Sequence, residues 1–195
     1  MNEQQKTLLN DYGVLVLPEE LEHEAFVLVL TACLMRPDQE IRLYCRGNGG
    51  SCRTAFAIID VIQDHGNVVG LLTSEANSNH GVIFAGCPRR YVYPRGMLGL
   101  HRTALDAIYH VDMPYAKNRF QELEVGDHAN AKIYAAACQD QTQWGEAFWY
   151  SQIDQQGSKG LVQFNAEFLI KCGMARPIRE LHTQNFEHSF SGRTA

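Results

Sequence analysis

Ser78 and His101 are the residues of this chain whose types and contexts suit nucleophilic catalysis. Ser78 follows the apolar segment 68–73 and precedes a second one, 82–85, so it lies where a strand passes into a helix. A serine at such a turn can attack a carbonyl carbon, because the next backbone amide helps to bind the oxyanion. His101 closes the short apolar stretch 97–100, where it can act as general base. The pair therefore predicts acyl-transfer chemistry.

Gly49 and Gly50 supply a third feature of that chemistry. They follow the apolar segment 41–45, and backbone N–H groups in a tight glycine turn can bind a developing oxyanion. The same Asn-Gly-Gly pattern is also typical of a plain turn. It lacks the Gly-Lys-Ser/Thr signature of a phosphate loop, which argues against nucleotide binding.

Each of the two side chains also has a purely structural interpretation. Ser78 can be a helix N-cap, a role for which two nearby polar residues compete. A single histidine at the end of an apolar strand, such as His101, is more often structural than catalytic. His110 and His128 are other candidates for a base, although both lie in segments that read as loop or exposed helix.

The elements that must position these residues alternate between strands and helices. We expect strands at 14–17, 41–45, 68–73, 90–93 and 97–100, and helices at 21–35, 54–63 and 81–86. This alternation predicts an α/β protein with a largely parallel sheet, whose sites form beyond the carboxyl ends of the strands. After His101 only helices are expected, at 114–139, 143–153 and 165–172, the last capped by Asn165 and ended by Gly173.

Composition narrows the class of protein. The chain has 195 residues and a net charge of -5, so one domain is expected and neither nucleic acid nor an anionic membrane is an expected partner. It shows no membrane-length apolar run and no secretion-signal pattern, which predicts a cytoplasmic protein. The six cysteines fit no zinc-ligand spacing and are expected to be buried free thiols. No cofactor and no metal is expected.

Taken in order, these segments resemble the proteolytic subunit of the Clp protease family. The similarity runs from about Val14 to Met174. It is carried by the strand 41–44 with the Gly-Gly-Ser turn 49–51, the helix 55–60, the Glu-Ala-Asn-Ser turn 75–78, the segment 90–94, Leu100-His101 and the closing segment 166–174.

This resemblance implies a crotonase-like fold with a long handle helix that mediates the stacking of rings. It implies a single domain with a head at 14–113, a handle at about 114–139, a C-terminal helical part at 140–180 and a loose tail at 181–195. It further implies a homo-oligomer of one ring or stacked rings, which hydrolyses peptides or unfolded proteins inside a chamber. An ATP-dependent unfoldase is the implied partner.

The same resemblance assigns roles to individual residues. It implies that Ser78 is the nucleophile and His101 the general base. The backbone amides of Gly49 or Gly50, together with that of Asn79, are the implied oxyanion donors.

The third member of the family's triad is where this chain departs most. Counted without gaps, Leu161 stands at the aspartate position. Asp154 is the nearest upstream carboxylate and is the expected partner of His101, with Asp140 as a weaker candidate. Two alternatives stay open: a catalytically impaired pseudo-peptidase that acts as a ring subunit or regulator, and an acyl-CoA enzyme on the same fold.

Overall fold

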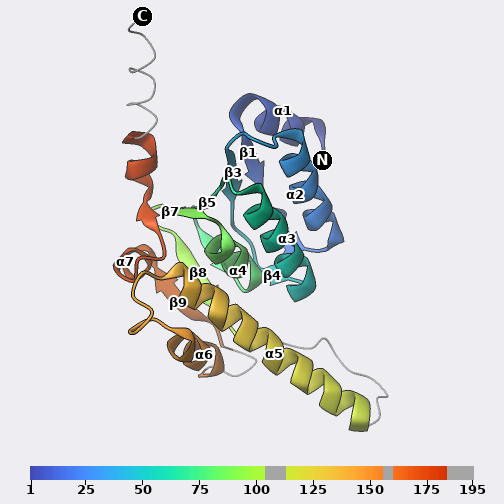
Figure 1. Cartoon of the computed structure of the whole chain (residues 1–195), viewed down its shortest axis with the longest axis vertical. Helices are drawn as coiled ribbons and strands as arrows, with labels where there is room; N and C mark the ends of the chain where they lie inside the picture. Colours follow the sequence, from blue (N-terminus) through green and yellow to red (C-terminus); the bar gives the residue numbers. More distant parts are fainter. Residues whose placement is uncertain (104–112, 156–159, 184–195) are drawn as a thin grey trace, which may run out of the picture.

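A five-stranded parallel sheet forms the centre of the molecule (Figure 1). The computed structural model describes residues 1–103, 113–155 and 160–183. Within them the sheet has the strand order β1-β3-β5-β7-β10, and every neighbouring pair is parallel. The strands are β1 (Val14–Val16), β3 (Ile41–Tyr44), β5 (Val68–Leu72), β7 (Arg89–Val92) and β10 (Arg176–Pro177). The expected α/β class with a mostly parallel sheet is thus confirmed.

Helices connect consecutive strands of this sheet. Crossovers run through α2 (His23–Met35), α3 (Cys52–His65) and α4 (Asn79–Gly86), within a few residues of the predicted ranges. Every residue of α4 is buried, because this helix packs against α3 on one side and against the long helix α5 on the other. An N-terminal helix, α1 (Glu3–Tyr12), was not expected from the apolar pattern, because only Leu9 of its residues is buried.

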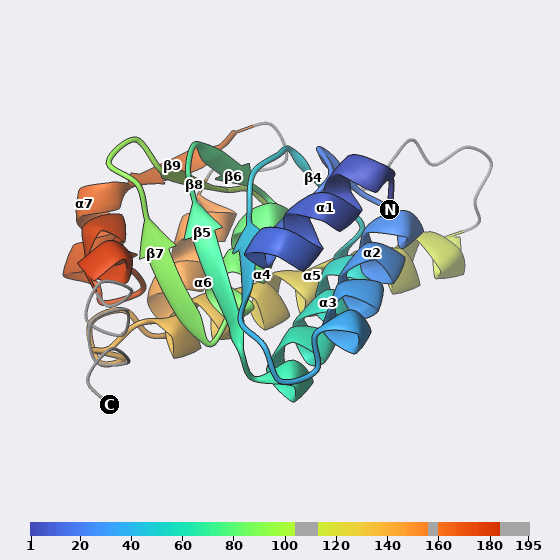
Figure 2. The ribbon, with the colours of Figure 1, turned by 90° about the horizontal axis from the view of Figure 1, so that it is seen from above.

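A second, smaller sheet lies beyond the carboxyl ends of β5 and β7 (Figure 2). It consists of β6 (Glu75–Asn77), β8 (Met97–Leu100) and β9 (Val162–Asn165), with β6 parallel and β9 antiparallel to β8. A short parallel pair joins β2 (Glu20–Leu21) to β4 (Gly49–Gly50). Only β8 was expected, since the others are too short or too polar to show a strand pattern.

The C-terminal half is mainly helical, as the sequence predicts. It contains α5 (Met113–Ala137), α6 (Glu146–Asp154) and α7 (Ala166–Lys171). The C-terminal part of α5 packs against α4 and α6, whereas its N-terminal part projects away from the rest of the molecule (Figure 1). The side chain of Asn165 accepts a hydrogen bond from the Phe168 N–H at 3.0 Å, and Gly173 adopts a φ of 73°, so both predicted boundaries of α7 are confirmed.

The structure also shows the state of the cysteines and whether any described helix is suited to cross a membrane. All six thiols are free, and five of them are buried, with Cys52 partly exposed. In the described ranges no helix combines the length and the apolar character that crossing a membrane requires. Of the predicted tail 181–195, the structure describes only the first three residues.

Candidate active site

Ser78 has a backbone conformation that is rare for a residue with a side chain. Its φ is 53° and its ψ is -128°, and it is the only non-glycine residue with positive φ in the described part of the chain. Such a conformation costs about 1–3 kcal/mol and persists only where the surrounding structure enforces it. Ser78 occupies the N-cap position of α4, but its side chain makes no capping hydrogen bond. The hydroxyl is therefore not used to stabilise the helix.

Hydrogen bonds on both sides of Ser78 enforce this conformation. The Ser78 N–H donates to the Gly99 carbonyl of β8 at 2.7 Å. The Ser78 carbonyl accepts from the N–H groups of Gly81 and Val82, at 2.9 and 3.3 Å, in the first turn of α4. The turn is thus fixed between a strand and a helix, as the sequence predicted for a nucleophile in this position.

Gly49 lies directly against Ser78. A Cβ atom added to Gly49 would come within 2.6 Å of the Ser78 Cβ and 2.9 Å of its Oγ, and the φ of Gly49 is +121°. Both the space and the backbone angle therefore require glycine here. The approach is set by Gly47, whose N–H donates to Glu75 and whose carbonyl accepts from the Asn77 N–H, at 3.0 and 2.9 Å. The structure thus brings the double glycine and the serine together.

Asn79 joins the start of α4 to the glycine turn. As the first helical residue it contributes a backbone N–H that has no partner within the helix, which is what an oxyanion donor requires. Its buried side chain donates from Nδ2 to the Gly50 carbonyl at 2.6 Å and to the Cys52 Sγ at 3.2 Å. The sequence predicted only the backbone role; the side chain also fixes the two proposed oxyanion segments relative to each other.

His80, the next residue of α4, also contacts a segment that is distant in the sequence. Its ring is fully buried, and its Nε2 donates to the Pro18 carbonyl at 2.9 Å. Burial lowers the pKa of His80 from its usual value, and the hydrogen bond to Pro18 offsets part of that effect. A Cβ on Gly47 would lie 2.8 Å from the His80 Nε2, so the ring explains why glycine stands at position 47.

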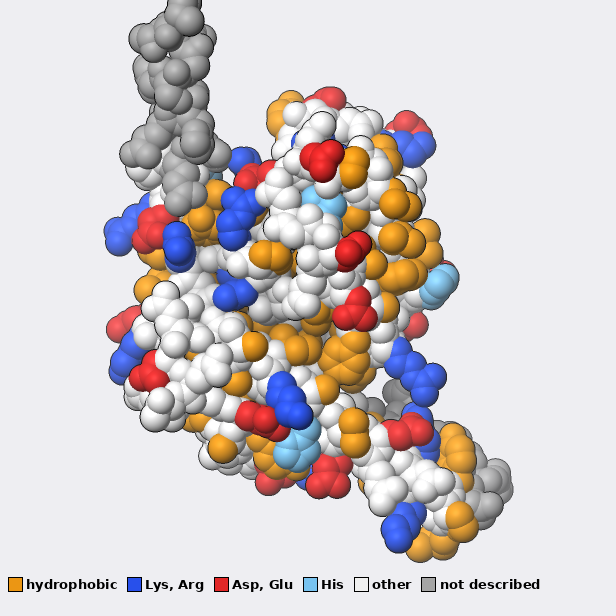
Figure 3. Space-filling view, viewed as in Figure 1, with side chains coloured by type: hydrophobic (Ala, Val, Ile, Leu, Met, Phe, Trp, Pro, Cys, Tyr) orange, Lys and Arg blue, Asp and Glu red, His pale blue; other side chains and the backbone are white. Residues whose placement is uncertain are grey.

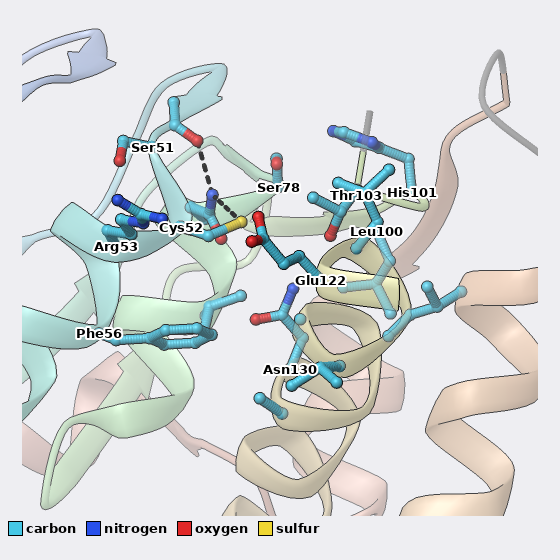
Figure 4. A pocket seen from close by; sticks show the side chains of 18 of the residues that line it. Ser51, Cys52, Arg53, Phe56, Ser78, Leu100, His101, Thr103, Glu122 and Asn130 are labelled. Carbon is cyan, nitrogen blue, oxygen red and sulfur yellow. Dashed lines mark hydrogen bonds between the residues drawn. The ribbon is translucent and has the colours of Figure 1, made fainter. Parts of the chain in front are cut away.

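Ser78 and His101 line one large cavity of about 1540 Å³. Figure 4 shows both residues at its upper edge, with Asn130 of α5 below them. Other lining residues come from α3, α4 and α5, and they include Cys52, Arg53, Phe56, Asn79, Val82, Glu122 and Tyr134. Gly50 also lines this cavity, so the residues predicted for the nucleophile, the base and the oxyanion donors meet at one space.

The imidazole of His101 does not contact Ser78 in this structure. Among the described residues no hydrogen bond joins the two, and the His101 Nδ1 instead lies 2.6 Å from the Arg102 carbonyl oxygen. Catalytic hydrogen bonds are often formed only once a substrate is bound, so this separation is compatible with catalysis.

No carboxylate of the described residues contacts His101. Asp154 pairs with the Arg102 Nη1 at 3.1 Å, so the structure does not bring Asp154 to the histidine. Asp140 accepts from backbone N–H groups two and three residues ahead and thereby caps a turn. His128 lies away from the cavity, in contact with Glu146, and His110 falls outside the described residues.

Leu161 lies near the end of β8 that leads into His101. The pairs of β8 and β9 run from Met97↔Asn165 to Leu100↔Val162, so His101 directly follows and Leu161 directly precedes the residues of the last pair. A Cβ added to Gly99 would lie 3.0 Å from the Leu161 Cδ1, so the Leu161 side chain lies on the face that Gly99 shares with His101. The assignment of Leu161 to the family's aspartate position stays a prediction.

Sequence reasoning missed the contribution of α5 to the cavity. Glu122, Gly126, Asn130 and Tyr134 all line it, at a spacing of four residues that places them on one face of the helix. Asn130 is only 7% exposed, and its Oδ1 has no hydrogen-bond partner among the residues that the structure describes. The spacing of four was the available signal, but the side chains are too mixed in polarity to stand out as a stripe.

Comparison with protein-family models finds no family that matches the chain, and comparison with curated proteins finds no match either.

Proposed function

We propose that this chain is a serine peptidase in which Ser78 is the nucleophile and His101 the general base. The observation that carries the proposal is the conformation of Ser78, which has positive φ, lies at the start of α4 and has Gly49 against its side chain. Strain of this kind concentrates at functional sites, because it must be maintained by the rest of the fold. A serine that only capped α4 would have no need of it.

The reaction follows from the groups around the cavity. The Ser78 Oγ attacks the carbonyl carbon of the scissile bond while the His101 Nε2 takes the hydroxyl proton. The negative charge that develops on the carbonyl oxygen is bound by the N–H of Asn79 and by an N–H of the Gly49–Gly50 segment. The imidazolium then protonates the leaving amine, and water releases the acyl group by the same steps.

The size of the cavity favours an extended peptide as substrate. Sites for small molecules usually enclose about 300–1,000 Å³. The cavity of about 1540 Å³ exceeds that range. Its lining combines apolar groups such as Phe56 and Val82 with charged ones such as Arg53 and Glu122, which suits a chain of mixed side chains.

A crotonase-like fold and self-association belong to the same proposal. The small sheet of β6, β8 and β9 beyond the central strands supports the fold. Exposed apolar side chains support association, since isolated monomers rarely expose groups of them. Figure 3 shows apolar side chains along α2, where Val27, Leu34 and Met35 are exposed. The projecting part of α5 adds Met113, Phe120 and Val125.

Labelling with a fluorophosphonate probe tests the proposed nucleophile. Wild-type protein should be labelled, peptide mapping should place the adduct on Ser78, and both Ser78→Ala and His101→Ala should abolish labelling. The same variants should lose hydrolysis of peptide esters and peptide amides. Labelling that persists in Ser78→Ala would exclude Ser78 as the nucleophile.

The second candidate function is a ring subunit that does not cleave peptides. Among the described residues no carboxylate contacts His101, and this favours the alternative. A histidine without a carboxylate partner is a weaker base, because nothing stabilises the imidazolium that forms during the reaction. This alternative predicts a stable oligomer that binds peptides, without labelling at Ser78 and without hydrolysis.

A further inference from the structure

The segment that follows His101 is attached to α5 through one buried carboxylate. Asp127 is 1% exposed, and its Oδ1 accepts from the Thr103 N–H at 2.8 Å and from the Thr103 Oγ1 at 2.6 Å. Its Oδ2 lies 3.4 Å from the Arg102 Nε. Asp127 therefore contacts both residues that come directly after His101. A buried carboxylate is costly unless it is paired and hydrogen-bonded, and here three contacts satisfy it.

The Arg102 carbonyl determines which nitrogen of His101 carries the proton. A carbonyl oxygen can only accept, so the Nδ1 at 2.6 Å must be the protonated nitrogen of the neutral ring. The Nε2 is then unprotonated, which is the form a general base needs. In metal and protease sites a carboxylate often fixes the tautomer in this way, and a backbone carbonyl can take that role.

The Arg102 side chain forms ion pairs with two carboxylates, and the two pairs differ in strength. Its guanidinium contacts Asp127 through Nε and Asp154 through Nη1, at 3.4 and 3.1 Å. The Asp154 side chain is 55% exposed, so water screens that pair, whereas Asp127 is buried. Asp127 also binds the backbone of Thr103, which Asp154 does not. Asp127 is therefore the main constraint on the 102–103 backbone.

We propose that Asp127 is a positioning residue for His101. By fixing Arg102 and Thr103 it holds the Arg102 carbonyl where it selects the Nδ1–H tautomer of His101. The carboxylate thus acts on His101 from α5, through the backbone of Arg102 and Thr103. This inference rests on the proposed function only in that His101 serves as the base for Ser78.

The experiment compares Asp127→Asn with Asp154→Asn in the full-length chain. Each variant removes one carboxylate from Arg102, but only Asp127→Asn weakens the attachment of Thr103. NMR of ¹⁵N-histidine-labelled protein, above the titration range of the ring, reports the tautomer of His101. Wild type and Asp154→Asn should show the Nδ1–H form, whereas Asp127→Asn should show a mixture. Fluorophosphonate labelling of Ser78 should slow about 10- to 100-fold in Asp127→Asn alone.

A second, milder variant keeps the test possible if Asp127→Asn does not fold. Thr103→Val removes only the hydroxyl contact to Asp127 and should shift the tautomer in the same direction by less. An unchanged Nδ1–H tautomer in folded Asp127→Asn, or in Thr103→Val where Asp127→Asn does not fold, would overturn the inference. The tautomer shift should persist in a Ser78→Ala background, because it needs no nucleophile. Absence of wild-type labelling with a normal tautomer shift would therefore count against the proposed peptidase and support the positioning role.

Discussion

Leu161 and His101 lie just beyond the last pair of the β8–β9 ladder, Leu100↔Val162, so an apolar side chain lies near the strand end that leads into the histidine. The side chain is 39% exposed and packs against Gly99. The proposed function predicts that a carboxylate at position 161 reaches the ring and competes with the Arg102 carbonyl for its Nδ1–H. A substitution at position 161 therefore tests whether the proposed site lacks only the third residue of a catalytic triad.

Leu161→Asp should increase the rate of Ser78 labelling and of peptide ester hydrolysis by about tenfold or more, because a carboxylate stabilises the imidazolium that forms during the reaction. Initial rates against substrate concentration would show the gain in kcat. Leu161→Asn is the matched control, since it has the same shape without the charge and should give no gain. Equal rates in the two variants would show that position 161 does not reach His101.

Ser78→Gly should leave the protein more stable than Ser78→Ala by about 1 kcal/mol, because glycine adopts positive φ without the steric cost that alanine carries. Both variants lack the hydroxyl and should be equally inactive, so the comparison isolates the backbone strain. Urea denaturation of the two variants measures the difference. An alanine variant as stable as the glycine variant would mean that the φ of 53° stores no strain.

Gly49→Ala should slow labelling of Ser78 by about 100-fold, since a methyl group 2.6 Å from the Ser78 Cβ must displace the reacting side chain. Gly66→Ala is the control for the backbone cost alone. Gly66 also has positive φ, at +71°, but nothing lies within 4 Å of its added Cβ. It should lose about 1 kcal/mol of stability and keep the wild-type labelling rate. A normal labelling rate in Gly49→Ala would contradict the close approach.

The free energy of unfolding should decrease as the pH is lowered, because His80 titrates at a lower pH in the folded chain than in the unfolded chain. Burial lowers the pKa of His80 below 6.5, so below that pH the unfolded chain binds more protons than the folded chain. The free energy of unfolding attributable to His80 is therefore complete above pH 6.5 and is lost as the pH falls through the lower folded-state pKa. His80→Gln keeps a donor near Pro18 but does not titrate. Urea denaturation from pH 5 to pH 8 should show a shallower pH dependence for this variant, and identical slopes would contradict the prediction.

Asn130→Leu should raise stability by about 1 kcal/mol, because it removes a buried acceptor that has no partner. Asn130→Asp should instead lower it, since a carboxylate there would be buried without a counter-charge. Thermal unfolding of both variants measures this. If the Asn130 amide serves to bind peptides, Asn130→Leu should also raise KM for peptide substrates with little change in kcat.

Much of the central sheet could be predicted because β5 is apolar on both faces and β3 carries apolar residues at alternate positions. Segment 68–72 is buried throughout and reads as a strand from composition alone. The turn at Ser78 could be predicted for a related reason, since it lies between that strand and the fully buried helix α4. Local hydrophobicity was sufficient wherever an element is buried on all sides.

The parts of the site that depend on long-range contacts could not be predicted. Asp127 lies on a mixed-polarity helix, and nothing in its neighbourhood along the chain shows that it binds residues 102 and 103. Asp154 is near Leu161 in sequence, yet the fold directs it to Arg102. Pairing in space, rather than spacing along the chain, therefore determines which carboxylates contact the two residues that follow His101.

Two adjacent residues of α4 tie the reactive turn to distant parts of the chain. Asn79 reaches Gly50, 29 positions earlier, and His80 reaches Pro18, 62 positions earlier. The first turn of α4 alone therefore does not fix the unusual dihedral angles of Ser78, which also depend on the docking of Gly99 and of these remote segments. If Ser78 is the nucleophile as we propose, a nascent or partly folded copy would carry an ordinary serine, and the ability to cleave would arise only once the whole domain has folded.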